Sequence, residues 1–262
     1  MGSVVAATGR VALGFGRYLL DMYTLLHATG RALLRSGAAL SPPVLRACLH
    51  QVVFTGLDAL PVLMAIALLA GATITIEALT QLPRVGAGDL LGAVLAVIVV
   101  RELGPICAAL VVVGRSGSAI AAELATMQVG RQVEGLEAQG IDPAAFIVWP
   151  RLAGSVVALA GLTLTFDATA LLGGYLVARL KLFLPFPYFL QQVGQALTFT
   201  DLALTIVKVA IFSLCITALA CHQGLAIRGS ATEIPQATTR AVIHSFVACF
   251  AFNVIVALIF YF

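Results

Sequence analysis

Five long, uninterrupted apolar runs are the feature that most limits how this chain can fold. They cover residues 54–76, 90–113, 146–178, 202–221 and 242–262. A helix needs roughly 20 mostly apolar residues to cross about 30 Å of hydrocarbon, and each run offers that length. The apolar residues are continuous and do not alternate with polar ones, which disfavours a transmembrane β-barrel. Because 61% of the residues are hydrophobic and only 10% are charged, we predict an all-α polytopic membrane protein with five transmembrane helices.

The region before the first run has a different character. Within residues 1–50, apolar side chains recur at helical spacing opposite Arg17 and Asp21: Val11, Phe15, Tyr18, Leu19, Met22, Leu25 and Leu26. Charges interrupt the apolar residues, so the region does not read as a signal peptide. We predict an N-terminal amphipathic helix that lies in the headgroup plane, with a buried core helix as the alternative. Residues 51–262 are assigned to a single membrane domain.

The distribution of Lys and Arg predicts the orientation of the chain. Ten of these residues fall in segments 1–53, 114–151 and 222–241, whereas the alternating loops hold only Arg84, Arg179 and Lys181. The positive-inside rule therefore predicts a cytoplasmic N-terminus and an external Phe262. The net charge is only +3 and no basic run suggests nucleic acid as a partner.

A pair of charges lies in the middle of the second apolar run. Glu102 is about 18 Å from Leu90 along a helix, which is near the bilayer midplane. A charge at that depth commonly costs about 3 kcal/mol on insertion scales. Arg101 and Glu102 are consecutive, so they point about 100° apart and are poor partners for each other. We expect each charge to have a partner elsewhere, either on another helix, on a second copy of the chain or on a lipid headgroup.

Pro105 follows this pair and has no N–H for the carbonyl of Arg101. We predict a local break in the helix there, and broken helices near the midplane often lie on substrate paths. The alternative is a structural ion pair with a neighbouring span, for instance Glu102 with Lys208. Asp58 and Asp167 also lie within apolar segments and receive no role from the sequence.

The segment between the second and third runs predicts a short amphipathic helix over about residues 126–139. Val133 and Leu136 lie on one stripe, with Arg131, Glu134 and Glu137 on the other faces. Gly140 suits the end of this helix, and Asp142 suits the N-cap of the next. Such a helix is either a solvated connector or a docking surface for a cytoplasmic partner.

Four ordered segments resemble the signature segments of the MlaE/YrbE permease family: "RELGP", "GRSGSAIAAELATM", "GLEAQGIDPAAFIVWPRLAG" and "ATTRAVIHS". Members are membrane subunits of ABC systems that move phospholipids and other lipids between membranes, and the resemblance covers about residues 45–262. It implies a homodimeric permease in a bacterial inner membrane, with two cytoplasmic ATPase subunits and an external MCE-domain protein that carries lipid. It also implies that residues 126–139 form the coupling helix, whose contacts with the ATPase involve Arg131, Val133, Glu134, Leu136 and Glu137.

The chain departs from the family pattern at three places. Arg131 stands where an acidic residue is expected, and Asn253 stands where many members carry Asp in the last span. Glu77 occupies a position where an uncharged amide is common. The first departure bears on the details of ATPase contact.

The lysines argue independently for a partner ATPase. A P-loop needs Gly-Lys-Ser/Thr, yet the only lysines are Lys181 after Leu180 and Lys208 after Val207. We therefore expect ATP to bind a partner subunit, and we expect no catalytic residues and no cofactor in this chain. The cysteines and histidines are scattered without metal-ligand spacing.

Taken with the resemblance, the intramembrane charges predict a lipid cavity lined by Arg101, Glu102, Pro105 and Lys208. A secondary transporter or channel that uses Arg101, Glu102 and Lys208 is the main alternative, although no inverted repeat is apparent. A membrane enzyme is disfavoured further because no nucleophile–base pair appears.

Overall fold

The computed structural model describes Thr24 and residues 42–86, 90–227 and 230–261. The amphipathic helix predicted from Val11 to Leu26 lies outside the described residues, apart from Thr24. The described residues form helices and short connections, with no strand among them. The helical elements are α2 (Pro42–Thr55), η2 (Leu57–Ala59), α3 (Leu60–Gln81), η3 (Leu82–Val85), α4 (Leu91–Ala96), η5 (Val97–Leu103), α5 (Gly104–Val112), η6 (Val113–Gly117), α6 (Ser118–Val129), α7 (Gln132–Ala138), η7 (Ala144–Val148), α8 (Trp149–Leu182), α9 (Phe186–Ala196), α10 (Phe199–Leu225), η8 (Ala231–Glu233) and α11 (Ile234–Tyr261).

Five helical stretches are long and apolar enough to cross a membrane, which confirms the predicted number of spans. They are Pro42–Arg84, Leu91–Val129, Ala144–Leu182, Phe199–Leu225 and Ala231–Phe260. The second and third contain 39 residues each, so they are about 58 Å long and must tilt or project beyond the hydrocarbon.

The loops predicted at 114–151 and 222–241 are correspondingly too long. Helix α6 continues to Val129, α10 continues to Leu225, and α11 already begins at Ile234. Apolar composition marks only the part of a helix that can lie in hydrocarbon, and these helices extend past that part.

The second span does not break at Pro105, so the predicted interruption is wrong. The chain stays helical from Leu91 to Val129 because the π-helical segment η5 precedes α5, and Pro105 lies in the first turn of α5. Because the helix runs on from η5 into α5, Pro105 still removes one N–H that a preceding carbonyl would otherwise accept. The wider π turn before it leaves backbone carbonyls that can bond to a neighbouring helix.

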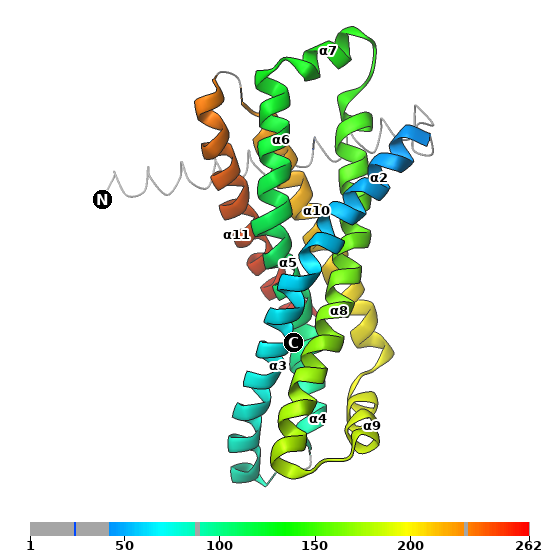
Figure 1. Ribbon diagram of the computed structural model, residues 1–262, viewed down its shortest axis with the longest axis vertical. Helices are drawn as coiled ribbons and strands as arrows, with labels where there is room; N and C mark the ends of the chain where they lie inside the picture. Colours follow the sequence, from blue (N-terminus) through cyan, green and yellow to red (C-terminus); the bar gives the residue numbers. More distant parts are fainter. Residues whose placement is uncertain (1–23, 25–41, 87–89, 228–229, 262) are drawn as a thin grey trace, which may run out of the picture.

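Helices α3 and α8 run side by side in the lower part of the view in Figure 1. Glycines allow their backbones to approach closely. A Cβ at Gly71 would lie 1.8 Å from the carbonyl oxygen of Ala170, and one at Gly173 would lie 2.4 Å from that of Leu68. Small residues at this interface serve packing within the chain.

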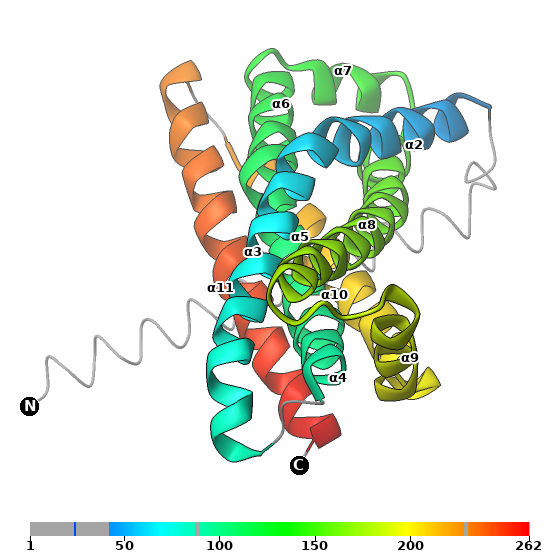
Figure 2. The same ribbon diagram turned by 60° about the horizontal axis from the view of Figure 1, so that its bottom comes forward.

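The first span bends at Gly56, between α2 and α3, as Figure 2 shows. Arg115 of η6 donates to the carbonyl of Phe54 at this bend and pairs with Asp58 at 3.0 Å. Asp58, which received no role from the sequence, therefore joins the first and second spans.

Two short helices lie at opposite ends of the bundle (Figure 1). Helix α7 caps the end formed by α6 and the start of the third span, whereas α9 lies beside α4 at the other end. Helix α9 falls in a segment treated as a loop in the sequence analysis. Its Gln192 Oε1 accepts a hydrogen bond of 2.8 Å from the backbone N–H of Gly92, near the start of α4.

Replacing Gly173 with alanine is expected to destabilise the fold by about 1–3 kcal/mol, because its new methyl group forces α3 and α8 apart. The matched control is Gly161→Ala in the same helix, since a Cβ at Gly161 meets nothing within 4 Å. Thermal unfolding of the purified proteins in detergent measures both. Equal midpoints for the two variants would contradict the close-approach account.

Candidate functional site: an intramembrane charge cluster

Arg101 lies opposite the start of α10 and forms a two-pronged ion pair with Asp201. Its Nη2 donates to Asp201 Oδ2 at 2.8 Å, and its Nε lies 2.8 Å from Oδ1. Asp201 Oδ2 also accepts bonds from the backbone N–H and the hydroxyl of Thr198, which completes a capping box. Arg101 is thereby fixed to the first turn of the fourth span.

Lys208 compensates for the proline in the second span. An N–H at residue 105 could reach the carbonyl of Val100 in a π turn or that of Arg101 in an α turn. Lys208 Nζ donates to the Arg101 carbonyl at 2.9 Å, and Thr205 Oγ1 lies 3.2 Å from the Val100 carbonyl. A buried acceptor without a donor costs about 1–3 kcal/mol, so α10 supplies what Pro105 cannot.

Glu102 receives two donors from different spans. Lys208 Nζ donates to its Oε1 at 2.8 Å, and Asn253 Nδ2 of α11 donates to its Oε2 at 3.0 Å. The structural ion pair kept as an alternative in the sequence analysis is therefore present. An Asp in place of Asn253 would put a second carboxylate against Glu102 unless one of the two were protonated.

The cluster, defined here as Arg101, Glu102, Asp201, Lys208 and Asn253, balances two cationic with two acidic side chains. The side chains of Lys208 and Asp201 are 1% and 5% exposed, whereas those of Arg101 and Glu102 are 25% and 38% exposed. Arg101 pairs with Asp201, and Glu102 pairs with Lys208. The two consecutive charges therefore have different partners, as the 100° between their side chains predicts. Pro105 is buried as well, so it packs inside the chain next to the cluster.

Asp167 of α8 lies against Gly104, two residues after Glu102 in the second span. It is buried, and its Oδ1 has no hydrogen-bond partner within the described part of the chain. A Cβ at Gly104 would lie 1.9 Å from that oxygen, so Gly104 makes room for the carboxyl group.

The residues assigned to ATPase coupling gather at α7. Val133 is buried and Leu136 is half-buried against the core at the adjoining ends of α6, α8 and α10, whereas Arg131, Glu134 and Glu137 are exposed. The predicted helix 126–139 is in fact two elements. Residues 126–129 finish α6, and Arg131, with φ of 54°, turns the chain into α7. Gly140 at φ of 75° ends α7 and Asp142 caps the next helix, as predicted.

Sequence reasoning missed Asp201 and Thr205, and noted Asn253 only as a departure from a family pattern. The Thr198-x-x-Asp201 spacing is a recognisable capping box, but it predicts a helix start and says nothing of a partner one hundred residues away. Thr205 Oγ1 lies 2.9 Å from the Asp201 carbonyl in its own preceding turn, as Thr in a helix commonly does, and nothing in the local sequence shows that it also lies 3.2 Å from the Val100 carbonyl of another span.

Comparison with known proteins gives concordant matches. A model of the family described as Permease MlaE matches residues 48–259. A probable ABC transporter permease protein of Rickettsia typhi is 33% identical over 207 residues, which cover 79% of this chain and 80% of the relative. The intermembrane phospholipid transport system permease protein MlaE of Haemophilus influenzae is 27% identical over 235 residues, or 88% of this chain and 89% of the relative. The chloroplastic protein TRIGALACTOSYLDIACYLGLYCEROL 1 of Arabidopsis thaliana is 31% identical over 216 residues, or 82% of this chain and 62% of the relative.

The fold and its polar centre define a multi-pass helical membrane protein whose spans are joined by buried charges. With the family model matched over most of its length, the chain belongs to the MlaE permease family. The match favours a permease over the secondary transporter or channel considered from the sequence.

Replacing Lys208 with methionine is expected to destabilise the protein by about 3 kcal/mol, because it strips Glu102 and the Arg101 carbonyl of a donor. Adding Glu102→Gln should restore part of this loss, since no unpaired charge then remains. Thermal unfolding in detergent measures the cycle, with Ile206→Met on the exposed face of α10 as the control. A double variant no more stable than Lys208→Met would contradict the pairing account.

Proposed function

We propose that this chain is the permease subunit of an ABC-type transporter that moves phospholipid or a related lipid, driven by ATP hydrolysis in a separate subunit. The observation that carries the proposal is the family match over residues 48–259 of a five-span helical chain. Support for the lipid comes from the Haemophilus influenzae relative, whose name specifies phospholipid transport. Support for the ATPase comes from relatives named as ABC transporter permeases.

The assembly we propose is a homodimer in the inner membrane, with cytoplasmic ATPase subunits at α7 and an external MCE-domain lipid carrier at the opposite end. The excess of Lys and Arg in segments 1–53, 114–151 and 222–241 of the sequence supports this orientation. A cytoplasmic N-terminus and an external C-terminus follow from it.

In this proposal, Arg101 and Glu102 form part of the wall of the lipid cavity. Both side chains keep partial exposure although their charges are paired. The planar guanidinium of Arg101 has five N–H donors and suits phosphate oxygens. Lys208 and Pro105 are buried, so we assign them to the support behind the wall.

Purification of the chain from its native membrane tests the proposed function. A stoichiometric P-loop ATPase should co-purify, and ATPase activity of that complex should respond to phospholipid. A chain that purifies without any ATPase and conducts ions or solutes by itself would instead establish a channel or secondary transporter.

Replacing Leu136 with aspartate is expected to abolish lipid stimulation of the ATPase. The substitution puts an unpaired charge into the half-buried face of α7, which releases α7 from the membrane domain. Leu136→Met keeps the volume and polarity and serves as the control, with normal stimulation expected. Normal stimulation in Leu136→Asp would remove α7 from the coupling path.

A further inference from the structure

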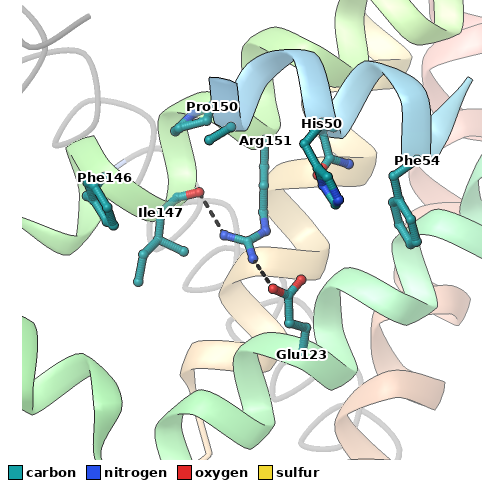
Figure 3. A pocket seen from close by; sticks show the side chains of 9 residues that line it. His50, Phe54, Glu123, Phe146, Ile147, Pro150 and Arg151 are labelled. Atoms are coloured by element: carbon teal, nitrogen blue, oxygen red, sulfur yellow. Dashed lines mark hydrogen bonds and ion pairs between the residues drawn. The ribbon is translucent and has the colours of Figure 1, made fainter. Parts of the chain in front are cut away.

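A cavity of about 420 Å³ lies between α2, α6 and the start of the third span (Figure 3). This volume is within the range of small-molecule sites. Apolar side chains stand on two sides of it, with Phe146 and Ile147 on one side and Phe54 on the other (Figure 3); Pro150 also lines the cavity. Between them is a polar wall that includes His50, Glu123 and Arg151, and Gln51 also lines the cavity.

A cation and an anion stand together on the polar wall. Arg151 Nη2 lies 2.8 Å from Glu123 Oε1, and Arg151 Nη1 donates to the Ile147 carbonyl at 2.9 Å. These contacts involve two of the five N–H groups of the guanidinium. The Arg151 side chain is 14% exposed and that of Glu123 is 60% exposed, so the carboxylate faces open space. A ligand with both charges can therefore bind without breaking the pair.

The site lies near the α7 end of the bundle. Glu123 is six residues before the end of α6 at Val129, which is about 9 Å along the helix axis. Arg151 is seven residues after the start of η7 at Ala144, or about 10 Å. Because the second and third spans exceed the hydrocarbon thickness, this depth suits the boundary between headgroups and acyl chains. A charged wall with apolar side chains on both sides at that boundary favours an amphiphile over a wholly polar solute.

We propose that this cavity binds a zwitterionic phospholipid with a primary amine, taken from the leaflet on the α7 side. Its phosphate pairs with Arg151, its ammonium group donates to Glu123, and its two acyl chains lie against Phe54 on one side and Phe146 on the other. An anionic glycerol headgroup offers Glu123 no cation, and a quaternary ammonium offers it no N–H donor. This cavity is separate from the charge cluster. The proposed function is needed only to identify the leaflet on the α7 side as the cytoplasmic one.

Lipid binding to the purified full-length protein tests this inference. After delipidation in detergent, phosphatidylethanolamine and phosphatidylglycerol are added in equal amounts and retained lipid is measured by native mass spectrometry. We expect phosphatidylethanolamine to be preferred about tenfold, the value of one charge-assisted hydrogen bond. Glu123→Gln should abolish the preference, and Arg151→Gln should weaken retention of both lipids.

Two further variants separate binding from folding. Glu77→Gln removes a carboxylate at the far end of the first span and should leave the preference unchanged. The exchange Glu123→Arg with Arg151→Glu preserves the ion pair but exchanges the positions of its two charges, so the preference should fall although the protein folds. An unchanged preference in this exchange, or in Glu123→Gln, overturns the proposal.

Soluble glycerophosphoethanolamine distinguishes a lipid from a free headgroup. It should compete only weakly with phosphatidylethanolamine, because it lacks the acyl chains that the apolar side chains accommodate. Competition as strong as that of the lipid would overturn the lipid assignment and indicate a soluble ligand. Absence of retained lipid in the wild-type protein would overturn the site itself.

Discussion

The need to satisfy backbone carbonyls away from water shapes the centre of this protein. Pro105 removes one N–H from the middle of the second span, and the hydrocarbon offers no water in its place. Lys208 of α10 donates to the Arg101 carbonyl, Thr205 Oγ1 lies 3.2 Å from the Val100 carbonyl, and Lys208 also neutralises Glu102. The fourth span is consequently fixed in register against the second, and Asn253 brings the fifth to the same point.

Two polar sites occur at different depths along one continuous helix. The charge cluster lies around Arg101 and Glu102, and the Glu123–Arg151 pair lies nearer α7. Because the chain is helical from Leu91 to Val129 and then turns directly into α7, a displacement of α7 moves the helix that carries both sites. Under the proposed function, an ATPase at α7 has a mechanical route to the polar centre.

The sequence predicts the parts of this structure that depend on local chemistry. Long apolar runs indicate five spans, the 100° between consecutive residues separates the partners of Arg101 and Glu102, and Gly140 and Asp142 mark a helix end and a helix start. The charges alone also suggest Glu102 and Lys208 as a pair. Asp201 is different, because its bond to Arg101 depends on how the second and fourth spans align, which no local pattern encodes. The π turn that keeps the helix intact at Pro105 likewise depends on donors from another span.

Lipid transfer by the reconstituted complex tests most directly whether the cluster belongs to a transport path. Glu102→Gln removes a charge while keeping its shape, and Arg101→Lys keeps a charge while losing the two-pronged geometry. If these side chains form the cavity wall, Glu102→Gln complexes that assemble normally should transfer phospholipid several-fold more slowly, with Arg101→Lys less affected. Transfer at the wild-type rate by both variants, or failure of both to assemble, would contradict a role in transport and leave the cluster a purely structural one.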